Sequence, residues 1–264
     1  MDTSRLKQLA NQIRQQEEMK KSMKMATKRQ LRMLPKVPKV PGYEFHALYL
    51  PATNVSGDFY DFVMNGETSI GMAMGDVSGH GIEAGIIMGM AKKAMQIYAK
   101  GRTGPKEILV VANEDLSQDL DGETFLSASY GELDIAQRVL RFARAGHNPP
   151  FLVNPARQPA VSEIKPNGMV IGVDKTGKRF PLVMKEESIQ LQSGDLFFQY
   201  TDGLVEAPDK EKNEFGEDRV KELLLRNHAL NVIDLLNILE ETIHSYIGAS
   251  AQEDDITMIA FKVL

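Results

Sequence analysis

The spacing of apolar residues divides the chain into a polar helical segment and a longer region in which short β-type runs are interrupted by pairs of helices. Residues 3–34 contain no Gly or Pro and are rich in Gln, Lys, Arg, Met and Leu, which favour the α-helix. Their apolar positions form an intermittent stripe that fits no sustained heptad, so any coiled coil is poorly specified. Three prolines between residues 35 and 41 end the helix. We therefore expect a helical arm over residues 1–35 and a folded domain over 43–264.

The domain shows alternating or continuous apolar runs of the length of β-strands. Asn65-Gly66 and Ala136-Gln137 separate neighbouring runs as hairpin turns. Because the helices come in adjacent pairs, the pattern predicts an α+β fold with a mostly antiparallel sheet. The expected strands are Tyr43–Leu50, Phe59–Met64, Ser69–Met74, Thr124–Asp134, Arg138–Ala145, Phe151–Asn154, Met169–Val173, Ser188–Leu191, Asp195–Tyr200 and Ile256–Val263, and the expected helices are Ile82–Ala99, Pro105–Leu120, Glu217–Arg226 and Val232–Tyr246.

Composition excludes several classes of protein. The 264 residues include no cysteine, which rules out disulfides, thiolate zinc sites and a thiol nucleophile. No stretch approaches the roughly 18 consecutive apolar residues of a membrane span. The start of the chain is charged and rich in Gln, and it lacks the apolar core of a signal peptide. We therefore expect a cytoplasmic protein with no membrane insertion.

The net charge of −5 conceals a strong asymmetry along the chain. Residues 1–40 carry 11 Lys and Arg against 3 Asp and Glu, a net charge of +8, and the remainder carries 20 against 33, a net charge of −13. A basic segment can bind nucleic acid or an anionic membrane surface. The arm lacks the aromatic residues that accompany binding of single strands, which favours a solvated helix in contact with the acidic body or a partner. The acidic body argues against nucleic acid as a substrate.

Four aspartates occur at the edges of predicted strands and suggest a metal site. Asp58 and Asp76 bracket a strand–turn–strand segment, Asp202 follows the run that ends at Tyr200, and Asp254 opens the last strand. One such Asp is usually a turn former, but four in the same setting could converge on one rim. Close carboxylates raise one another's pKa unless cations neutralise them, and a ligand set without His or Cys suits Mg²⁺ or Mn²⁺. Two such ions about 3.5–4 Å apart can activate water for attack on phosphorus.

The motifs resemble those of PPM-type metal-dependent serine/threonine protein phosphatases, in the bacterial SpoIIE/RsbU-like branch. Each motif is weak by itself, but together they follow the family's order over residues 43–264. The matching pieces are Leu50-Pro51-Ala52, Ser56-Gly57-Asp58-Phe59-Tyr60-Asp61, Gly75-Asp76-Val77-Ser78-Gly79-His80-Gly81, Ala145-Gly146-His147-Asn148-Pro149-Pro150, Ser193-Gly194-Asp195, Tyr200-Thr201-Asp202-Gly203-Leu204-Val205-Glu206-Ala207, Phe215-Gly216 and Asp254-Asp255-Ile256-Thr257.

This resemblance implies a four-layer αββα sandwich preceded by the helical arm, with a site for two Mn²⁺ or Mg²⁺ ions at one end of the β-sandwich. Asp255 falls where many relatives carry Asn, so its role is the least certain of the set. The implied ligands are Asp58, Asp76, the backbone carbonyl of Val77, Asp202 and Asp254, with Asp255 as a further candidate.

Three other residues are weaker candidates. His80 could protonate the leaving seryl oxygen, but the eukaryotic branch places its histidine two residues after the aspartate and His80 follows Asp76 by four. The alternative is a turn histidine that holds the Gly-rich loop. His147 is expected to be structural, and Arg144 is a weak candidate for binding phosphate.

By resemblance, the function is hydrolysis of phosphoserine or phosphothreonine on a small regulator, such as an anti-anti-sigma factor of the STAS type in a partner-switching pathway. The arm would then link to a sensor domain, a partner or a second copy of the chain, and it could set activity by moving the metal-bearing elements. Two alternatives stay open: a catalytically silent binding or regulatory module of the same fold, and a phosphodiesterase acting on a non-protein substrate.

Overall fold

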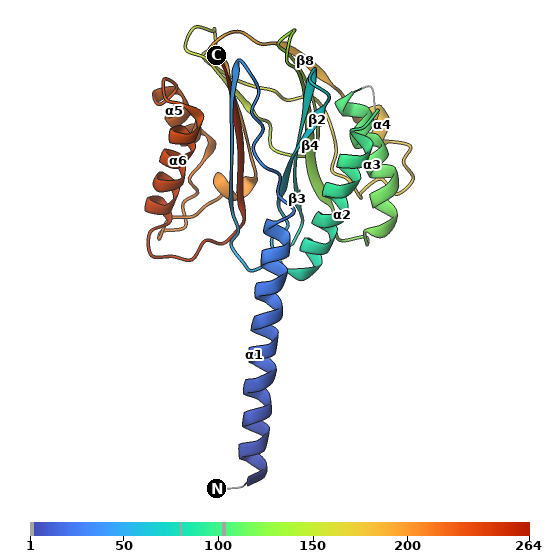
Figure 1. The fold of residues 1–264 in the computed structure, drawn as a ribbon, viewed down its shortest axis with the longest axis vertical. Helices are drawn as coiled ribbons and strands as arrows, with labels where there is room; N and C mark the ends of the chain where they lie inside the picture. The colour runs from blue at the N-terminus through green and yellow to red at the C-terminus, as the bar shows by residue number, and fades with distance from the viewer. Residues whose placement is uncertain (1–2, 80, 102–103) are drawn as a thin grey trace.

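Two antiparallel sheets packed face to face form the centre of the computed structural model, which describes residues 3–79, 81–101 and 104–264 (Figure 1). Within these residues each sheet has five strands. Sheet A has the order β1-β10-β9-β6-β7, and sheet B has the order β2-β3-β4-β5-β8. The strands of sheet A are β1 (Tyr43–Leu50), β10 (Ile256–Val263), β9 (Leu196–Tyr200), β6 (Phe151–Val153) and β7 (Val161–Glu163), and those of sheet B are β2 (Phe59–Asn65), β3 (Ser69–Val77), β4 (Leu126–Asp134), β5 (Val139–Ala145) and β8 (Glu187–Gln190).

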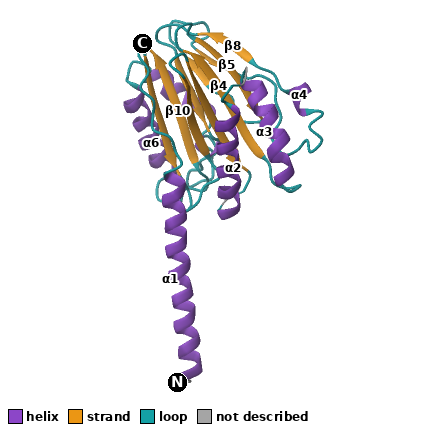
Figure 2. Cartoon of the chain, turned by 45° about the vertical axis from the view of Figure 1, so that its right-hand side comes forward, coloured by secondary structure: helices purple, strands orange, loops and turns teal. Residues whose placement is uncertain are grey.

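Helices cover the outer face of each sheet and complete four layers. Figure 1 shows α5 and α6 on one side of the sandwich and α2, α3 and α4 on the other, and Figure 2 shows α2 and α3 lying across the strands of sheet B. The arrangement follows from amphipathic helices that must each bury an apolar face against a sheet. The helices are α2 (Ile82–Tyr98), α3 (Pro105–Asp119), α4 (Phe180–Val183), α5 (Glu217–Arg226) and α6 (Val232–Ile247), and a 3₁₀ turn spans Asp202–Leu204.

Three apolar clusters match the three interfaces between the four layers. One lies between α2, α3 and sheet B, and includes Phe59 and Tyr130. A second lies between sheet A and the helices α5 and α6. The third fills the space between the sheets, where Phe197 and Phe261 stack with ring centroids 5.0 Å apart. The α+β class and the layered architecture expected from the sequence are therefore confirmed.

Two local expectations were wrong or incomplete. Met169–Val173 is not a strand: Ile171 forms an isolated bridge with Leu126, and Gly172 has φ +99°, a left-handed conformation that breaks an extended run. The short strand β7 and the short helix α4 were not predicted, because three or four residues give too little periodicity to detect. In addition β3 continues three residues beyond the expected end, so Asp76 lies within the strand.

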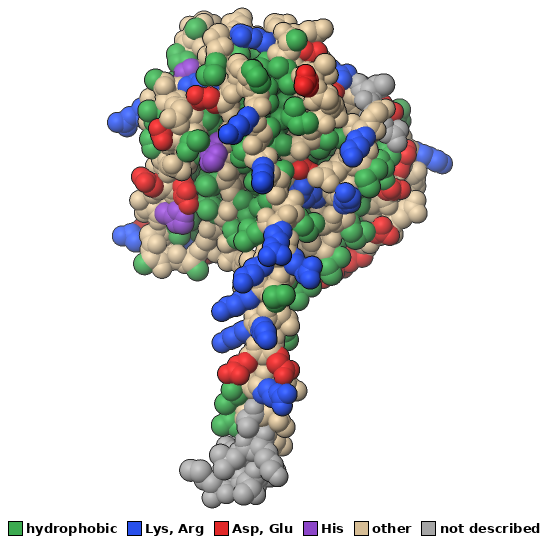
Figure 3. All heavy atoms as spheres, in the orientation of Figure 1, with side chains coloured by type: hydrophobic (Ala, Val, Ile, Leu, Met, Phe, Trp, Pro, Cys, Tyr) green, Lys and Arg blue, Asp and Glu red, His purple; other side chains and the backbone are tan. Residues whose placement is uncertain are grey.

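The arm is helix α1 (Thr3–Leu31), which projects away from the sandwich (Figure 1). Most of its described side chains are exposed, and Lys and Arg gather along the part of α1 next to the body (Figure 3). The last turns contact the domain: Gln30 is buried, and Thr27 donates to the carbonyl of Asn54. None of the helices that the structure describes combines the length and the apolar character needed to cross a membrane.

A close contact inside sheet B allows a test of the fold. A Cβ atom at Gly71 would lie 1.8 Å from Tyr130 Oη, and Tyr130 is completely buried, so its ring has no room to move. We expect Gly71→Ala to lower the free energy of unfolding by about 1–3 kcal/mol, measured by urea denaturation. Gly122→Ala is the control, because its Cβ would meet open space. The control should stay within about 0.5 kcal/mol of the parent protein. Equal stability of the two variants would contradict the packing.

Candidate active site

Asp58 joins the two sheets at one end of the sandwich. It directly precedes β2 in sheet B, and its side chain is 1% exposed. Its Oδ2 atom accepts hydrogen bonds from Thr257 Oγ1 at 2.6 Å and from Thr201 Oγ1 at 2.8 Å, and both threonines belong to sheet A or its immediate continuation. These two bonds hold the carboxylate in one orientation.

Asp76 and Val77 end β3 beside Asp58. Val77 is fully buried, and its amide donates to the carbonyl of Gly57 at 3.4 Å. A Cβ at Gly57 would approach the Val77 carbonyl oxygen to 2.8 Å, so glycine is needed there for the two segments to lie this close. The packing places a backbone carbonyl next to the segment that carries Asp58.

Asp202 and Asp254 are brought together by a second glycine contact. A Cβ at Gly203 would lie 2.1 Å from the Asp255 carbonyl oxygen and 3.3 Å from Asp254 Cβ. The 3₁₀ turn that begins at Asp202 therefore rests directly on the backbone that enters β10. Residues 202 and 254 lie far apart in the sequence, and this contact sets their separation.

The electrostatics of these carboxylates show that they interact. Burial raises the pKa of Asp58 well above its ordinary value, and repulsion from Asp76 adds to the effect. Burial raises the pKa of Asp76 to about 7, and repulsion from Asp202, Asp254 and Asp255 acts in the same direction. The pKa of Asp202 is also raised, by burial. Adding cations would relieve this repulsion, which is the behaviour of a carboxylate set suited to divalent metal.

As the side chains lie, no group of three or more His, Cys, Asp or Glu among the described residues is spaced to hold a metal ion. Two of the four carboxylates make hydrogen bonds to the backbone next to them. Asp202 Oδ1 accepts from the amide of Gly203 at 3.0 Å, and Asp254 Oδ1 accepts from the amide of Asp255 at 2.8 Å. Both carboxylates are turned toward their own backbone. The donor types and their electrostatic coupling fit Mn²⁺ or Mg²⁺.

Asp255 makes contacts of a different kind. Its Oδ1 accepts from the amide of Ala52 at 2.7 Å, and its Oδ2 accepts from the amide of Gly57 at 3.1 Å. Both carboxylate oxygens therefore hold the loop between β1 and β2, directly before Asp58. Its use as a metal ligand stays a prediction, and its position in the structure is that of a support for this loop.

The end of the arm reaches the same loop. Gln30 Nε2 donates to the carbonyl of Ser56 at 2.7 Å, and the amide of Ser56 donates to Gln30 Oε1 at 3.0 Å. Ser56 Oγ in turn accepts from the amide of Asp58 at 3.0 Å. A continuous chain of hydrogen bonds thus runs from α1 to the residue expected to bind metal.

The histidine and arginine candidates differ in placement. His147 is 1% exposed, its Nδ1 lies 2.8 Å from Ser127 Oγ, and burial lowers its pKa to about 3, so it is neutral and structural as expected. Arg144 donates to the His147 carbonyl at 2.7 Å; burial lowers its pKa, and the charges of Glu187 and Glu163 oppose this change. Its role in binding phosphate stays a prediction. His80 lies outside the described residues, so its proposed role stays a prediction.

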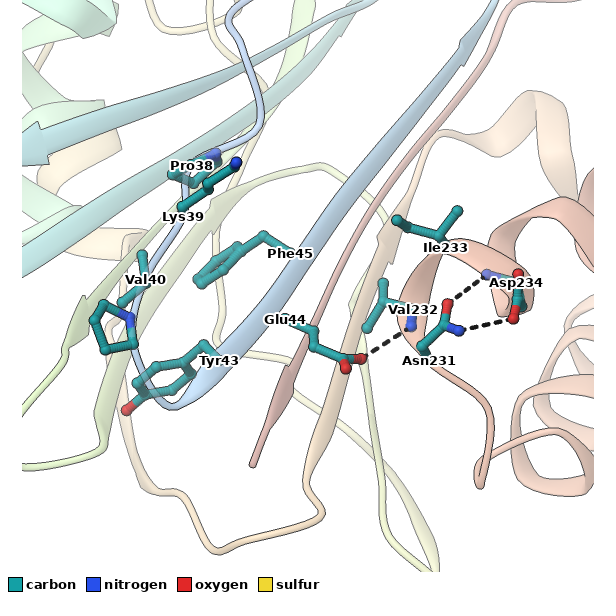
Figure 4. Close-up of a pocket in the computed structure, with 11 residues that line it drawn as sticks. Pro38, Lys39, Val40, Tyr43, Glu44, Phe45, Asn231, Val232, Ile233 and Asp234 are labelled. Atoms are coloured by element: carbon teal, nitrogen blue, oxygen red, sulfur yellow. Dashed lines mark hydrogen bonds between the residues drawn. The ribbon is translucent and has the colours of Figure 1, made fainter.

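A pocket of about 350 Å³ opens beside the carboxylates. Its lining includes Gly79, Gly203 and Asp254, together with Glu206, whose pKa is raised by burial and by repulsion from Asp202, Glu214 and Asp254. A larger pocket of about 750 Å³ lies at the start of β1 and α6 (Figure 4). This one is at the opposite end of β1, and its polar groups serve the helix start, where the amide of Val232 donates to Glu44 and that of Asp234 to Asn231. The smaller pocket is the better candidate for substrate.

Comparison with known proteins identifies the family of this chain. A sequence profile for the family described as Stage II sporulation protein E (SpoIIE) matches residues 66–264, well over half of the chain. The chain belongs to the SpoIIE family. The matched residues contain Asp76, Asp202 and Asp254, whereas Asp58 precedes them. The family expected from the motifs is thus confirmed.

The similarity to known proteins extends over most of this chain. Protein IcfG of Synechocystis sp. is 26% identical over 251 residues, which are 85% of this chain and 38% of that protein. Phosphoserine phosphatase RsbU of Bacillus subtilis is 27% identical over 257 residues, which are 94% of this chain and 71% of that protein. The chain therefore spans well under half of IcfG. Among solved structures, the SiaA-PP2C domain of Pseudomonas aeruginosa has a TM-score of 0.79 at 22% identity, covering 94% of this chain and 98% of that one, which shows a shared PP2C fold.

Several residues of this SpoIIE-family site were not singled out from the sequence. Thr201 and Thr257 hold Asp58, Ser127 holds His147, and Glu206 lines the pocket. Each threonine stands next to or near an aspartate within a recognised motif, and this adjacency was the available signal. Nothing in the linear order shows that both threonines bond to an aspartate from the other sheet.

The raised carboxylate pKa values predict how the metal-free protein responds to pH. Asp76 has a folded pKa of about 7 against an ordinary value of 3.8, so the native state binds more protons than the unfolded state between these values. Stability is then greatest below about pH 4 for this group and falls as pH rises through 7. We expect the free energy of unfolding in chelator to be lower at pH 8 than at pH 5 by a few kcal/mol, measured by urea denaturation.

The control for this prediction is Asp76→Asn, which removes the titrating group and should flatten the dependence. A metal-free protein that is as stable at pH 8 as at pH 5 would be inconsistent with the predicted coupling. So would an unchanged pH dependence in the variant.

Proposed function

We propose that this protein is a metal-dependent phosphatase that hydrolyses phosphoserine or phosphothreonine on a regulatory protein. The observation that carries the proposal is the convergence of Asp58, Asp76, Asp202 and Asp254 on one end of a PP2C-type sandwich, with electrostatic coupling between them. Membership of the SpoIIE family and the similarity to the phosphoserine phosphatase RsbU support it.

The residues would hold two Mn²⁺ or Mg²⁺ ions through Asp58, Asp76, the Val77 carbonyl, Asp202 and Asp254. When bound, such ions acidify water and polarise phosphoryl oxygens. The protein's own contribution is positional. Thr201 and Thr257 orient Asp58, and the glycine contacts at 57 and 203 hold the remaining ligands close to it. The neighbouring pocket lined by Gly203 and Glu206 would receive the peptide that carries the phosphate.

The substrate we propose is a small phosphorylated regulator of the STAS anti-anti-sigma type. Support comes from the relatives: one is a phosphoserine phosphatase, RsbU, and a similar solved structure contains the RsbU and RsbW domains of a Mycobacterium tuberculosis protein. Two alternatives remain distinct from this proposal. A catalytically silent module would not need four coupled carboxylates, and a nuclease or phosphodiesterase acting on nucleic acid would fit poorly with a body of 33 acidic against 20 basic residues.

The direct test is hydrolysis of para-nitrophenyl phosphate and of a phosphoserine peptide, with Mn²⁺ and with EDTA. We expect activity with Mn²⁺, none with EDTA, and a loss of more than about 100-fold in Asp202→Asn, because a ligand of the proposed metal pair is removed. The matched control is Asp119→Asn, which neutralises an exposed aspartate on α3. Metal binding without turnover on either substrate would favour the silent module, and no metal binding would refute the site.

A regulatory role for the arm is part of the proposal, since Gln30 bonds to the loop that leads to Asp58. Deleting residues 1–35 removes this contact, whereas deleting residues 1–20 removes exposed helix and leaves it in place. We expect only the longer deletion to change the Mn²⁺ concentration needed for half-maximal activity. Oligomeric state is measured in parallel by light scattering. If the longer deletion changes neither activity nor oligomeric state, the arm has no such role.

A further inference from the structure

A buried ion pair connects helix α2 to strand β2 within the interface that covers sheet B. Lys92 Nζ lies 2.7 Å from Asp61 Oδ2, and the two side chains are only 3% and 1% exposed. The other carboxylate oxygen of Asp61 accepts a hydrogen bond from the amide of Phe62 at 3.0 Å. Neither residue lines the pocket beside the aspartates, and the proposed reaction assigns no role to either of them.

Such a pair is expensive to keep in a protein interior. Removing two charges from water carries a large desolvation cost, and replacement by apolar residues of similar volume is often neutral or stabilising. Burial lowers the pKa of Lys92, and the hydrogen bond to Asp61 opposes that change. Stability alone therefore gives a weak reason for the pair, which suggests a role in fixing geometry.

The rest of the interface is poorly suited to fix where α2 sits. The five buried side chains of α2 are Ala84, Met88, Ala91, Lys92 and Met95. Alanine offers a smooth surface, and methionine adapts to irregular spaces. An interface of this composition tolerates small shifts of the helix along its axis, whereas such shifts would lengthen the ion pair, in which Lys92 Nζ lies 2.7 Å from Asp61 Oδ2.

Both elements lead directly into the proposed metal site. Strand β2 begins at Phe59, one residue after Asp58, and Asp61 lies three residues beyond Asp58. Helix α2 begins at Ile82, and the chain reaches it from Asp76 and Val77 through residues 78–81. Lys92 is ten residues into the helix, about 15 Å from its start, so a shift of the helix along its axis also moves Gly81, the residue directly before its first turn.

We propose that the Lys92–Asp61 pair is a positioning element that sets α2 relative to β2, and through them the spacing between Asp58 and the segment Asp76–Val77. The inference rests on the proposed function for the identity of the metal, and it deepens that function by naming residues outside the site that tune it. Lys92 and Asp61 act only through the ligands.

The test separates stability from metal binding with the double variant Asp61→Val, Lys92→Met. This variant replaces the pair by apolar side chains, so its thermal unfolding midpoint should equal or exceed that of the parent protein. We expect its Mn²⁺ affinity, measured by isothermal titration calorimetry, to be weaker by about tenfold or more. In the phosphatase assay, kcat should fall while KM for the phosphopeptide stays unchanged. A stable double variant with parental Mn²⁺ affinity would overturn the inference.

Two further variants serve as controls for the packing of the interface and for failure of the double variant to fold. Met95→Val perturbs the same interface without touching the pair, and it should leave Mn²⁺ affinity unchanged even where it lowers the unfolding midpoint. Asp61→Asn keeps the size of the side chain and one acceptor oxygen, so it tests the inference if the double variant does not fold. Its Mn²⁺ affinity should fall, and parental affinity in this variant would also overturn the inference.

The outcomes distinguish this inference from the proposed function. If the parent protein binds Mn²⁺ but hydrolyses neither substrate, the proposed function fails and the affinities of the variants still decide the role of the pair. If the parent protein binds neither Mn²⁺ nor Mg²⁺, both the proposed site and the positioning role are wrong.

Discussion

The site depends on one carboxylate that bridges two sheets. Asp58 stands directly before strand β2 of sheet B and accepts hydrogen bonds from Thr201 and Thr257 on the side of sheet A, in a place from which water is almost fully excluded. A buried carboxylate is stable only with such donors or with cations. The two sheets must therefore pack in one relative position for Asp58 to be satisfied, and that position also brings Asp76 close to Asp202 and Asp254.

Glycine contacts and a supporting aspartate complete this arrangement. Gly57 and Gly203 each allow backbone to approach backbone where a side chain would collide, and Asp255 ties the loop before Asp58 to the start of β10. The carboxylates then repel one another, and this repulsion is the cost of a site prepared for cations. Burial of apolar side chains in the three clusters between the layers stabilises the fold and offsets this repulsion.

Contacts from outside the site reach it along two routes. Gln30 at the end of the arm bonds to Ser56, and Ser56 bonds to the amide of Asp58. The Lys92–Asp61 pair joins α2 to β2 from the other side. Both sets of contacts involve the segment around Asp58, so a displacement of the arm or of α2 would move the same proposed ligand. A change in either contact would therefore alter the position of Asp58, which is a proposed metal ligand.

The α+β class, the helical arm and most strands can be predicted from the sequence, because periodicity and turn residues are local signals. The sequence also indicated the four aspartates, since each stands in a short motif at a strand edge. The folded structure was needed to show that Thr201 and Thr257 hold Asp58, that Asp255 supports a loop, and that Lys92 pairs with Asp61. It also showed that Met169–Val173 makes only an isolated bridge. These features depend on pairings between residues distant in the chain, and no local propensity encodes such pairings.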